Sequence, residues 1–246
     1  MGQRMHLNRA LSKLGLCSRT VAGLWIAEGR VRVNGRPADD PEQWVELGVD
    51  RIEAGSGAGP SPARDRVYLR MHKPAGYVTT RSDELGRKTV YDLLPEDLRG
   101  GWVFPVGRLD KDSEGLLLLT DDGAWADRLT DPAGHVDKEY RVKLDRKPLA
   151  ADLETLRQGG LKIAGRLTLP AGIETESGAW CRVRLREGLN RQIRRMFHAR
   201  GYTVKRLIRV AIGPLALGDL EPGAVLPLEK RWVEALGRPS QGSAKP

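Results

Sequence analysis

The sequence predicts an α+β fold in two parts, a small helical and hairpin module followed by a domain with a mixed, mainly antiparallel sheet. Segments that alternate apolar and polar residues, such as Cys181–Leu185, indicate half-buried strands. The apolar run Leu116–Leu119 indicates a strand buried on both faces, whereas helical spacing is confined to short stretches. A segment rich in Gly, Ser, Pro and Ala, residues 54–65, predicts a flexible linker between the two parts.

The N-terminal module is expected over residues 1–53. Leucines spaced three and four residues apart predict a helix over Leu7–Leu14, and a second helix follows over Val21–Ile26. Val31–Val33 is predicted to be a strand, and Asn34-Gly35 is a strong signal for a type I′ hairpin turn. The resulting unit is too small to bury a large core of its own.

The main domain is expected over residues 66–236 and a disordered tail over 237–246. Its predicted strands are Val67–Leu69, Tyr77–Thr80, Trp102–Val106, Leu116–Leu119, Tyr140–Leu144, Leu161–Ile163, Gly172–Thr175, Cys181–Leu185 and Tyr202–Ile212. Its predicted helices are Thr89–Leu94, Ala124–Leu129, Leu149–Leu156, Asn190–Arg200 and Arg231–Leu236. Thr89 and Asn190 are the expected N-caps of their helices.

Composition limits the class of protein. The 246 residues include 40% hydrophobic and 30% charged residues, enough apolar content to bury a core. The sequence has no run of about 18 apolar residues and no apolar N-terminal signal segment, so we expect a cytoplasmic protein without a membrane span. Cys17 and Cys181 have no paired spacing and are expected to be reduced thiols. The histidines lack metal-ligand spacing, so no metal site is expected.

Positive charge is concentrated in two regions of a chain whose net charge is +9. Residues 181–210 hold ten Lys and Arg against one acid, and residues 1–38 hold seven against one. Two separate basic patches predict two contacts on one nucleic acid. The alternative is that these charges only solvate a surface.

A charged loop, Gly107–Gly115, precedes the apolar run and is the predicted place of chemistry. It contains Asp110, Asp112 and Glu114, and carboxylates are costly to hold against a core unless they are paired. The sequence has no Walker-type glycine loop, dinucleotide fingerprint or second ligand cluster. An aspartate beside an arginine of the Asn190–Arg200 helix remains plausible, while the alternative is that all three acids form turns.

The N-terminal segment LNRALSKLGLCSR…AEGRVRVNGRP resembles the RNA-binding module named after small-subunit ribosomal protein S-four. The resemblance covers about residues 5–53. It implies that Lys13, Arg19, Arg30 and Arg32 contact structured RNA through its shape and phosphates rather than through its bases.

The loop and strand GRLDKDSEGLLLLTDDG are similar to the catalytic motif of pseudouridine synthases of the RsuA family, which modify ribosomal RNA. Three further segments agree in order and separation with that family: KPAG at residues 73–76, KEYRV at 138–142 and EGLNRQIRRMF at 187–197. Leu189 departs from the pattern, since the family often has a basic residue there. Together with the N-terminal module, the resemblance covers nearly the whole chain and implies a catalytic domain of pseudouridine synthase type.

The resemblance also implies roles for individual residues. Asp110 would be the essential nucleophile or base, Tyr140 would stack on the target base, and Arg194 would pair with Asp110. Asp112 and Glu114 would then be turn-formers. The other implied site residues are Arg108, which would contact the RNA and hold the target nucleotide out of its helix, the pocket residues Leu109 and Ile212, and the RNA contacts Lys73, Arg191 and Arg195.

The implied reaction is isomerisation of a uridine in ribosomal RNA, which requires no cofactor because no atoms enter or leave. We expect a monomer whose partner is ribosomal RNA or a pre-ribosomal particle. The segments SEGLLLLT, TLPAG and NRQIRRM favour a large-subunit target over a small-subunit one. Two other classes remain as alternatives: a catalytically silent RNA-binding or ribosome-assembly protein, and a glycoside-processing enzyme, against which the basic patches argue.

Overall fold

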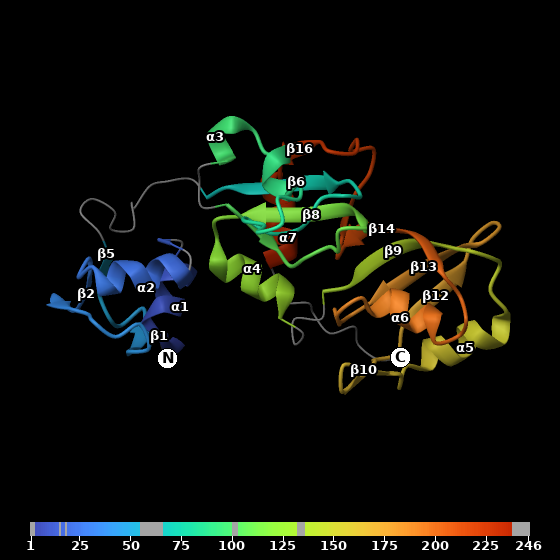
Figure 1. The fold of residues 1–246 in the computed structure, drawn as a ribbon, viewed down its shortest axis with the longest axis horizontal. Helices are drawn as coiled ribbons and strands as arrows, with labels where there is room; N and C mark the ends of the chain where they lie inside the picture. Colours follow the sequence, from blue (N-terminus) through green and yellow to red (C-terminus); the bar gives the residue numbers. More distant parts are fainter. Residues whose placement is uncertain are drawn as a thin grey trace.

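The chain forms an N-terminal module and a larger α+β unit that lie next to each other (Figure 1). The computed structural model describes residues 3–14, 16–17, 19–54, 66–99, 103–131 and 136–237, without the side chains of Arg19, Thr20 and Leu24. Residues 55–65 of the expected linker and 238–246 of the expected tail lie outside the described residues.

The module packs two helices against short strands. Its elements are β1 (Gln3–His6), α1 (Leu7–Lys13), α2 (Arg19–Ala27), β2 (Val31–Val33), β3 (Arg36–Pro37), β4 (Trp44–Leu47) and β5 (Ile52–Ala54). The predicted type I′ turn is confirmed, because Asn34 and Gly35 have φ values of 52° and 79°. The sequence did not predict β1, β4 and β5, which are only three or four residues long and are fixed by pairing β1 with β4 and β2 with β5.

The larger unit is built on one sheet with the order β12-β13-β9-β14-β8-β6-β16. Its strands are β6 (Tyr68–Lys73), β7 (Phe104–Val106), β8 (Glu114–Thr120), β9 (Lys138–Leu144), β12 (Gly172–Thr175), β13 (Trp180–Leu185), β14 (Val204–Ile212), β15 (Leu215–Ala216) and β16 (Val225–Pro227). Short β7 pairs with β8 and β15 with β14, and a separate hairpin joins β10 (Lys162–Ile163) to β11 (Arg166–Leu167). The pairings are antiparallel except that β8 and β14 run parallel, so the predicted mixed, mainly antiparallel sheet is confirmed.

The parallel pairing of β8 and β14 joins the two halves of the sheet over only a short stretch. Arg209 pairs with Gly115 at this junction. Gly115 has a φ of +108°, and a Cβ added there would lie 2.2 Å from the carbonyl oxygen of Arg209. The close approach of the two backbones therefore requires glycine at this position.

Helices cover both faces of this sheet (Figure 1). They are the 3₁₀ helix η1 (Val90–Leu93), α3 (Glu96–Arg99), α4 (Gly123–Thr130), α5 (Ala150–Gln158), α6 (Gln192–His198) and α7 (Lys230–Gly237). The Thr89 cap is confirmed, and Asp92 completes a capping box. The Asn190 cap is wrong, because α6 follows Arg191 in a left-handed conformation (φ 51°) and the Asn190 amide oxygen accepts from Arg195 instead.

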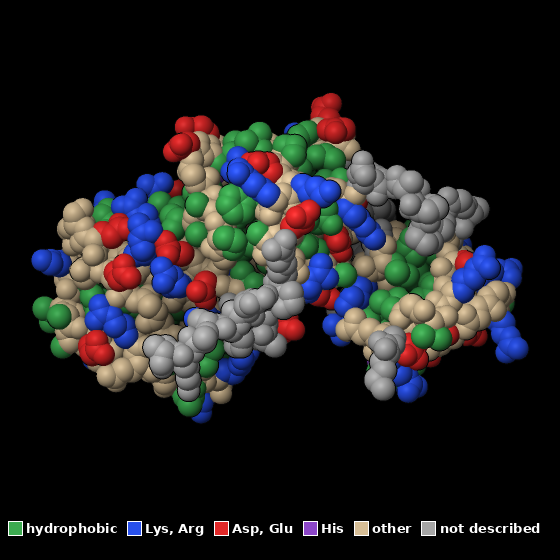
Figure 2. All heavy atoms as spheres, turned by 180° about the vertical axis from the view of Figure 1, so that it is seen from behind, with side chains coloured by type: hydrophobic (Ala, Val, Ile, Leu, Met, Phe, Trp, Pro, Cys, Tyr) green, Lys and Arg blue, Asp and Glu red, His purple; other side chains and the backbone are tan. Residues whose placement is uncertain are grey.

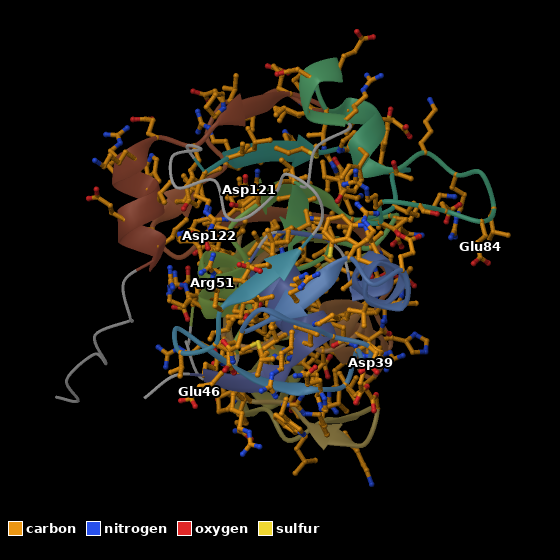
Figure 3. All side chains as sticks on the ribbon, turned by 90° about the vertical axis from the view of Figure 1, so that its left-hand side faces the viewer. Asp39, Glu46, Arg51, Glu84, Asp121 and Asp122 are labelled. Carbon is orange, nitrogen blue, oxygen red and sulfur yellow. The ribbon has the colours of Figure 1, made fainter. Side chains whose placement is uncertain are left out.

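The segment Tyr77–Thr80 is not the strand that the sequence predicts. It makes a single bridge between Val78 and Thr89, with hydrogen bonds from Val78 N to Lys88 O and from Val90 N to Val78 O. These bonds close an exposed loop, at whose tip Glu84 projects from the larger unit (Figure 3), and so remove the segment from the main sheet.

The predicted buried strand is confirmed as β8. Leu116 to Leu119 are all 0% exposed. Leu116 and Leu118 pack with α4 and α7 residues on one face, while Leu117 and Leu119 pack with Val90 and Leu109 on the other. Each fully buried leucine contributes about 2 kcal/mol of transfer free energy, so β8 is a rigid support for the loop that precedes it.

The module contacts the larger unit through α1 and α4. Lys13 forms an ion pair with Asp127 at 2.9 Å, and a Cβ added at Gly123 would lie 3.0 Å from the Lys13 carbonyl oxygen. The turn Asp121-Asp122, which starts α4, lies behind the module in Figure 3. Figure 2 shows that a hollow separates the two units over part of their facing surfaces.

Candidate active site

A cavity of about 470 Å³ opens beside the junction of β8 and β14. It is lined by the loop that precedes β8, the start of β9, the loop before α6 and the second half of β14. The predicted site residues among its lining are Arg108, Leu109, Asp110, Tyr140, Arg191 and Ile212. Segments more than 100 residues apart in the sequence therefore meet around one loop.

The Asp110 side chain lies at this cavity and is 30% exposed. The backbone of its loop turns between Asp110 and Ser113, whose amide donates to the Asp110 carbonyl oxygen at 3.0 Å. The Thr79 hydroxyl donates to the Leu109 carbonyl oxygen at 2.7 Å and accepts from the Leu109 amide at 3.3 Å. Gly76 N donates to Lys111 O at 2.7 Å, so the loop is held on both sides of Asp110.

Lys73 is an internal clamp of the loop rather than the predicted RNA contact. Lys73 is 0% exposed; it is the last residue of β6 and pairs with Gly115 of β8. Its Nζ donates to the carbonyl oxygens of Ser113 at 2.7 Å, Pro74 at 3.0 Å and Lys111 at 3.4 Å. Burial lowers the pKa of Lys73 to about 8, against the opposing charges of Asp112 and the other loop acids.

Two arginines of the α6 region face the loop acids, and their partners differ from the prediction. Arg191 Nη1 lies 3.6 Å from Asp110 Oδ2 and 3.1 Å from Asp112 Oδ1. Arg194, expected to pair with Asp110, forms its ion pair with Asp112 at 3.3 Å. It also donates to the carbonyl oxygens of Asp112 at 2.8 Å and Val204 at 3.0 Å. Arg194 thus ties the loop to β14 through Asp112 and Val204, and Arg191 is the cation beside Asp110.

Asp112 and Glu114 are ion-pair partners and not only turn-formers. Burial raises the pKa of Asp112, but hydrogen bonding from Arg191 and the charges of Arg194 and Arg191 outweigh it and leave the pKa lowered. Glu114 accepts two hydrogen bonds from Arg206 at 2.8 Å, and these bonds lower the pKa of Glu114. The acids on either side of the turn therefore anchor the loop to α6 and to β14.

The remaining predicted pocket residues supply the walls. Tyr140 is half-buried and packs against two hydrophobic clusters, one on each half of the sheet. Leu109 and Ile212 are buried at 6% and 3% exposure. Arg108 is exposed at the edge of the cavity. An aromatic and aliphatic surface is thus placed next to Asp110.

Two buried or half-buried cations of the cavity lining were not predicted as site residues. Arg209 is 3% exposed, and Lys138 donates to the Val136 carbonyl oxygen at 3.1 Å. The signal for Arg209 is present in the sequence, since it interrupts the apolar run Leu207–Ile212, but position alone does not show that the side chain is buried.

A buried polar pair also shapes the loop before α6. Glu187 Oε1 accepts from Gln192 Nε2 at 2.6 Å and from the Leu169 amide at 2.8 Å. Gln192 Oε1 in turn accepts from Leu189 N at 3.0 Å. These bonds hold the segment that carries Arg191 against the cavity.

The predicted RNA contacts of the module differ in exposure and in their partners. Lys13 is occupied by Asp127 and by Gln3, so α1 uses it to contact α4. Arg30 is exposed, pairs with Glu28 at 3.1 Å and lies over Trp25. Arg32 is exposed and donates to Gly35 O at 3.1 Å. The side chain of Arg19 lies outside the described part of the chain.

Arg195 of α6 is exposed and donates to Asn190 at 3.2 Å, outside the cavity lining. Among the described residues, no three His, Cys, Asp or Glu side chains are grouped so that they could hold a metal ion. No helix in the described ranges has the length and apolar character needed to cross a membrane.

Comparison with known families matches both parts of the chain. Residues 67–199 match the family described as RNA pseudouridylate synthase, and residues 5–50 match the S4 domain. A crystal structure described as a pseudouridylate synthase superposes with a TM-score of 0.70 at 28% identity, covering 94% of this chain and 99% of that one.

Relatives in other organisms carry names of the same family. An uncharacterized RNA pseudouridine synthase of Aquifex aeolicus is 36% identical over 95% of this chain and 97% of its own length. The dual-specificity RNA pseudouridine synthase RluF of Escherichia coli is 35% identical over 89% of this chain and 73% of its own. The ribosomal large subunit pseudouridine synthase B of Pseudomonas aeruginosa is 35% identical over 94% of this chain and 61% of its own. The chain therefore belongs to the RNA pseudouridylate synthase family, in its RsuA-type branch with an N-terminal S4 domain, and is a pseudouridine synthase.

Proposed function

We propose that this enzyme isomerises a specific uridine of ribosomal RNA, more specifically of the large subunit, with Asp110 as its nucleophile or base. One observation carries the proposal: Asp110 opens into the same cavity as Tyr140, Leu109 and Ile212, and its loop is held by Lys73, Thr79 and Arg194. A carboxylate fixed beside an aromatic and aliphatic wall suits a base that has left its stack.

The reaction needs the target nucleotide in an extrahelical position. Leaving the stack costs a few kcal/mol, which binding of the surrounding RNA must offset. Tyr140 provides a ring on which the base stacks, and Leu109 and Ile212 keep water from the other side. Arg108 is exposed at the cavity edge. It holds the displaced nucleotide outside its helix, either by binding the phosphate or by filling the position that the base has left.

Two routes are open to Asp110, and both conserve atoms and charge. The carboxylate can attack C1′ of the ribose and form an ester, or it can remove the C2′ proton and leave a glycal. In either route the bond from C1′ to N1 breaks and its electron pair stays on the uracil. The uracil then turns and C5 forms the new bond to C1′, while the ester bond from C1′ to Asp110 breaks or, in the glycal route, Asp110 returns the proton to C2′. The C5 proton is lost as N1 gains a proton. Exclusion of water prevents loss of the detached base.

Arg191 and Arg194 have separate tasks in this proposal. Arg191, 3.6 Å from Asp110, orients the carboxylate. Arg194 positions the loop through the Asp112 carbonyl oxygen and carboxylate. The role of Arg194 is thus to hold the loop that carries the reacting aspartate.

Ribosomal RNA as substrate is supported by the relatives and by the S4 domain. The Pseudomonas aeruginosa relative is named for the large subunit, and the segments SEGLLLLT and NRQIRRM favour the same branch. The exposed arginines Arg30 and Arg32 of the module and Arg195 of α6 are the surface cations that would contact RNA phosphates. A small-subunit uridine is the alternative target.

The test compares the wild type with Asp110→Asn and Asp112→Asn in a cell that lacks the endogenous enzyme, with pseudouridines mapped across both ribosomal RNAs. We expect one pseudouridine that wild type restores, that Asp110→Asn does not restore at all, and that Asp112→Asn restores more slowly. Each variant must still bind the RNA and fold. If Asp110→Asn restored the modification, Asp110 would not be the reacting group; a site in the small subunit would establish the alternative target.

A further inference from the structure

Arg209 is the most deeply buried cation among the residues that line the cavity. Its side chain is 3% exposed, and its Nε donates to the Leu116 carbonyl oxygen at 2.7 Å. Its Nη2 is buried and has no hydrogen-bond partner in the described part of the chain. A buried guanidinium N–H without an acceptor destabilises the folded state, so its presence at this position calls for an explanation.

The groups that surround Arg209 do not neutralise it. Within the described ranges no carboxylate comes within 4.0 Å of its guanidinium, whereas Lys138 lines the same cavity. Burial lowers the pKa of Lys138, and the charge of Arg209 lowers it further. Two cations facing one cavity create a region that favours an anion or an electron-rich acceptor.

The strand register puts these cations next to the pocket walls. Arg209 lies opposite Tyr140 in the β9–β14 pairing, and Ile212 lies opposite Lys138. Directly paired residues present their side chains on the same face of a sheet, so the Arg209 guanidinium shares a face with the Tyr140 ring. A base that stacks on Tyr140 is therefore brought beside Arg209 and Lys138.

We propose that Arg209, assisted by Lys138, binds a carbonyl oxygen of the flipped uracil and stabilises the negative charge that the base acquires when it leaves the ribose. This rests on the proposed function. Whether Asp110 attacks C1′ or removes the C2′ proton, the pair of electrons of the C1′–N1 bond stays on N1, and the resulting anion is delocalised onto the two carbonyl oxygens. Asp110 becomes an ester or a carboxylic acid at the same time, so the total charge is unchanged.

A buried donor is well suited to this task. Its charge is poorly screened in a cavity that excludes water, and no reorganisation is needed as charge develops. The neutral base of the ground state gains less from the cation than the anion does, so the interaction lowers the barrier rather than only tightening binding.

The competing explanation is structural. The Nε bond to Leu116 O joins β14 to β8, and Arg209 could serve only to hold that junction. A structural role predicts the same rate loss for every base, because the altered junction misplaces Asp110 whatever the leaving group. A charge-stabilising role predicts a larger loss for a poorer leaving group.

The experiment measures single-turnover cleavage of the N-glycosidic bond in a transcript of the RNA that wild type modifies, with either uridine or 5-fluorouridine at the target. Fluorine withdraws electrons and makes the base a better leaving group. Digestion to nucleosides and mass spectrometry report loss of the N-linked nucleoside. The variants are Arg209→Gln, which keeps a donor for Leu116 O, Arg209→Lys, which keeps the charge, and Lys205→Gln, an exposed loss of charge on the same strand.

For Arg209→Gln we expect the single-turnover rate of cleavage to fall on the order of 100-fold with uridine and about tenfold with 5-fluorouridine. RNA affinity should stay within about twofold of wild type. Arg209→Lys should lose less of the single-turnover rate than Arg209→Gln. Any change of rate in Lys205→Gln should be the same for both bases. Equal losses of Arg209→Gln on both bases, or no loss in a folded variant, would overturn the proposal.

If Arg209→Gln does not fold, Arg209→Lys decides by the same comparison of bases. Failure of the proposed function itself is distinguishable, because Asp110→Asn would then restore the modification that wild type makes.

Discussion

The two basic regions of the chain both have many more basic than acidic residues, but their side chains lie in opposite physical settings. In the S4 domain, Arg30 and Arg32 are exposed and bond to Glu28 and Gly35 close in sequence. Around the cavity, the Arg194 side chain is 13% exposed and Arg209 as a whole is 3% exposed. Their acceptors include the carbonyl oxygens of Asp112 and Leu116, more than 80 residues earlier in the chain. A basic sequence therefore indicates nucleic acid only where the side chains stay at the surface.

The difference has an energetic cause. A buried guanidinium loses its hydration, and this cost is repaid only by several well-placed acceptors. Two of the acceptors of Arg194, the carbonyl oxygen and the carboxylate of Asp112, lie on the loop that carries Asp110, so burial of Arg194 and placement of the aspartate are one arrangement. The module arginines keep their hydration and remain available to phosphates. Four variants, one of them a double substitution, test this contrast.

The largest effect is expected for Arg194→Met. Removal of a largely buried cation leaves the carbonyl oxygens of Asp112 and Val204 without their donor and the Asp112 carboxylate with Arg191 as its remaining partner, which costs about 3 kcal/mol of unfolding free energy. A loop shifted by about 1 Å would lower the single-turnover rate about 100-fold. Urea unfolding and rapid-quench kinetics measure the two effects. Arg195→Met, its exposed neighbour, should change stability by less than about 0.5 kcal/mol; equal destabilisation by both would remove the contrast.

Lys73→Met is expected to destabilise the protein by about 2 kcal/mol near neutral pH, because the carbonyl oxygens of Ser113, Pro74 and Lys111 lose their shared donor. The folded pKa of about 8 lies below the ordinary value of 10.5, so the unfolded chain binds more protons between these two pH values. The stability of wild type relative to Lys73→Met should therefore rise with pH in this window, by at most about 1.4 kcal/mol per pH unit.

Denaturant unfolding of wild type and Lys73→Met, carried out in parallel below and above the folded pKa, checks this pH dependence. A difference in stability that stayed constant between about pH 7 and about pH 9.5 would mean that Lys73 is not perturbed by its burial.

The double variant Arg30→Ala/Arg32→Ala should weaken RNA binding about tenfold and lower the slope of log affinity against log salt by about one for each lost phosphate contact. The rate at saturating RNA and the unfolding free energy should stay near wild type, because both side chains are exposed. Salt-dependent fluorescence anisotropy measures the slope. Arg51→Ala provides the control, since this exposed arginine of the same module is engaged by Glu53. An equal loss of affinity in that control would show that only net charge matters.

The smallest effect is expected for Glu114→Gln, about 1 kcal/mol or less, because its partner Arg206 is half exposed. Hydrogen bonds from Arg206 lower the pKa of Glu114, so its contribution is present at neutral pH and is lost as pH falls below the ordinary value of 4.5. Thermal unfolding at neutral and acidic pH should show the difference from wild type only at neutral pH. Persistence of the difference in acid would contradict the assignment.

Sequence reasoning predicted the elements whose local pattern is strong and failed where partners are distant. Leu116–Leu119, Gly172–Thr175 and the Asn34-Gly35 turn were predicted because apolar runs and turn residues act locally. The segment Tyr77–Thr80 has a strand-like composition, but hydrogen bonds to Lys88 and Val90 fold it into a loop. The Asn190 cap failed because bonds among Glu187, Leu189 and Gln192 set the start of α6.

The sequence by itself determined the fold class, the family motifs and the loop that carries Asp110, since each depends on the order and spacing of residues along the chain. Only the tertiary structure decided what each cation does. Lys73 became a buried clamp, Arg194 a tie to Asp112, and Arg209 an internal donor beside Tyr140. Burial decides these roles, because the same charged group binds phosphate when hydrated and positions loops or stabilises internal charge when water is removed.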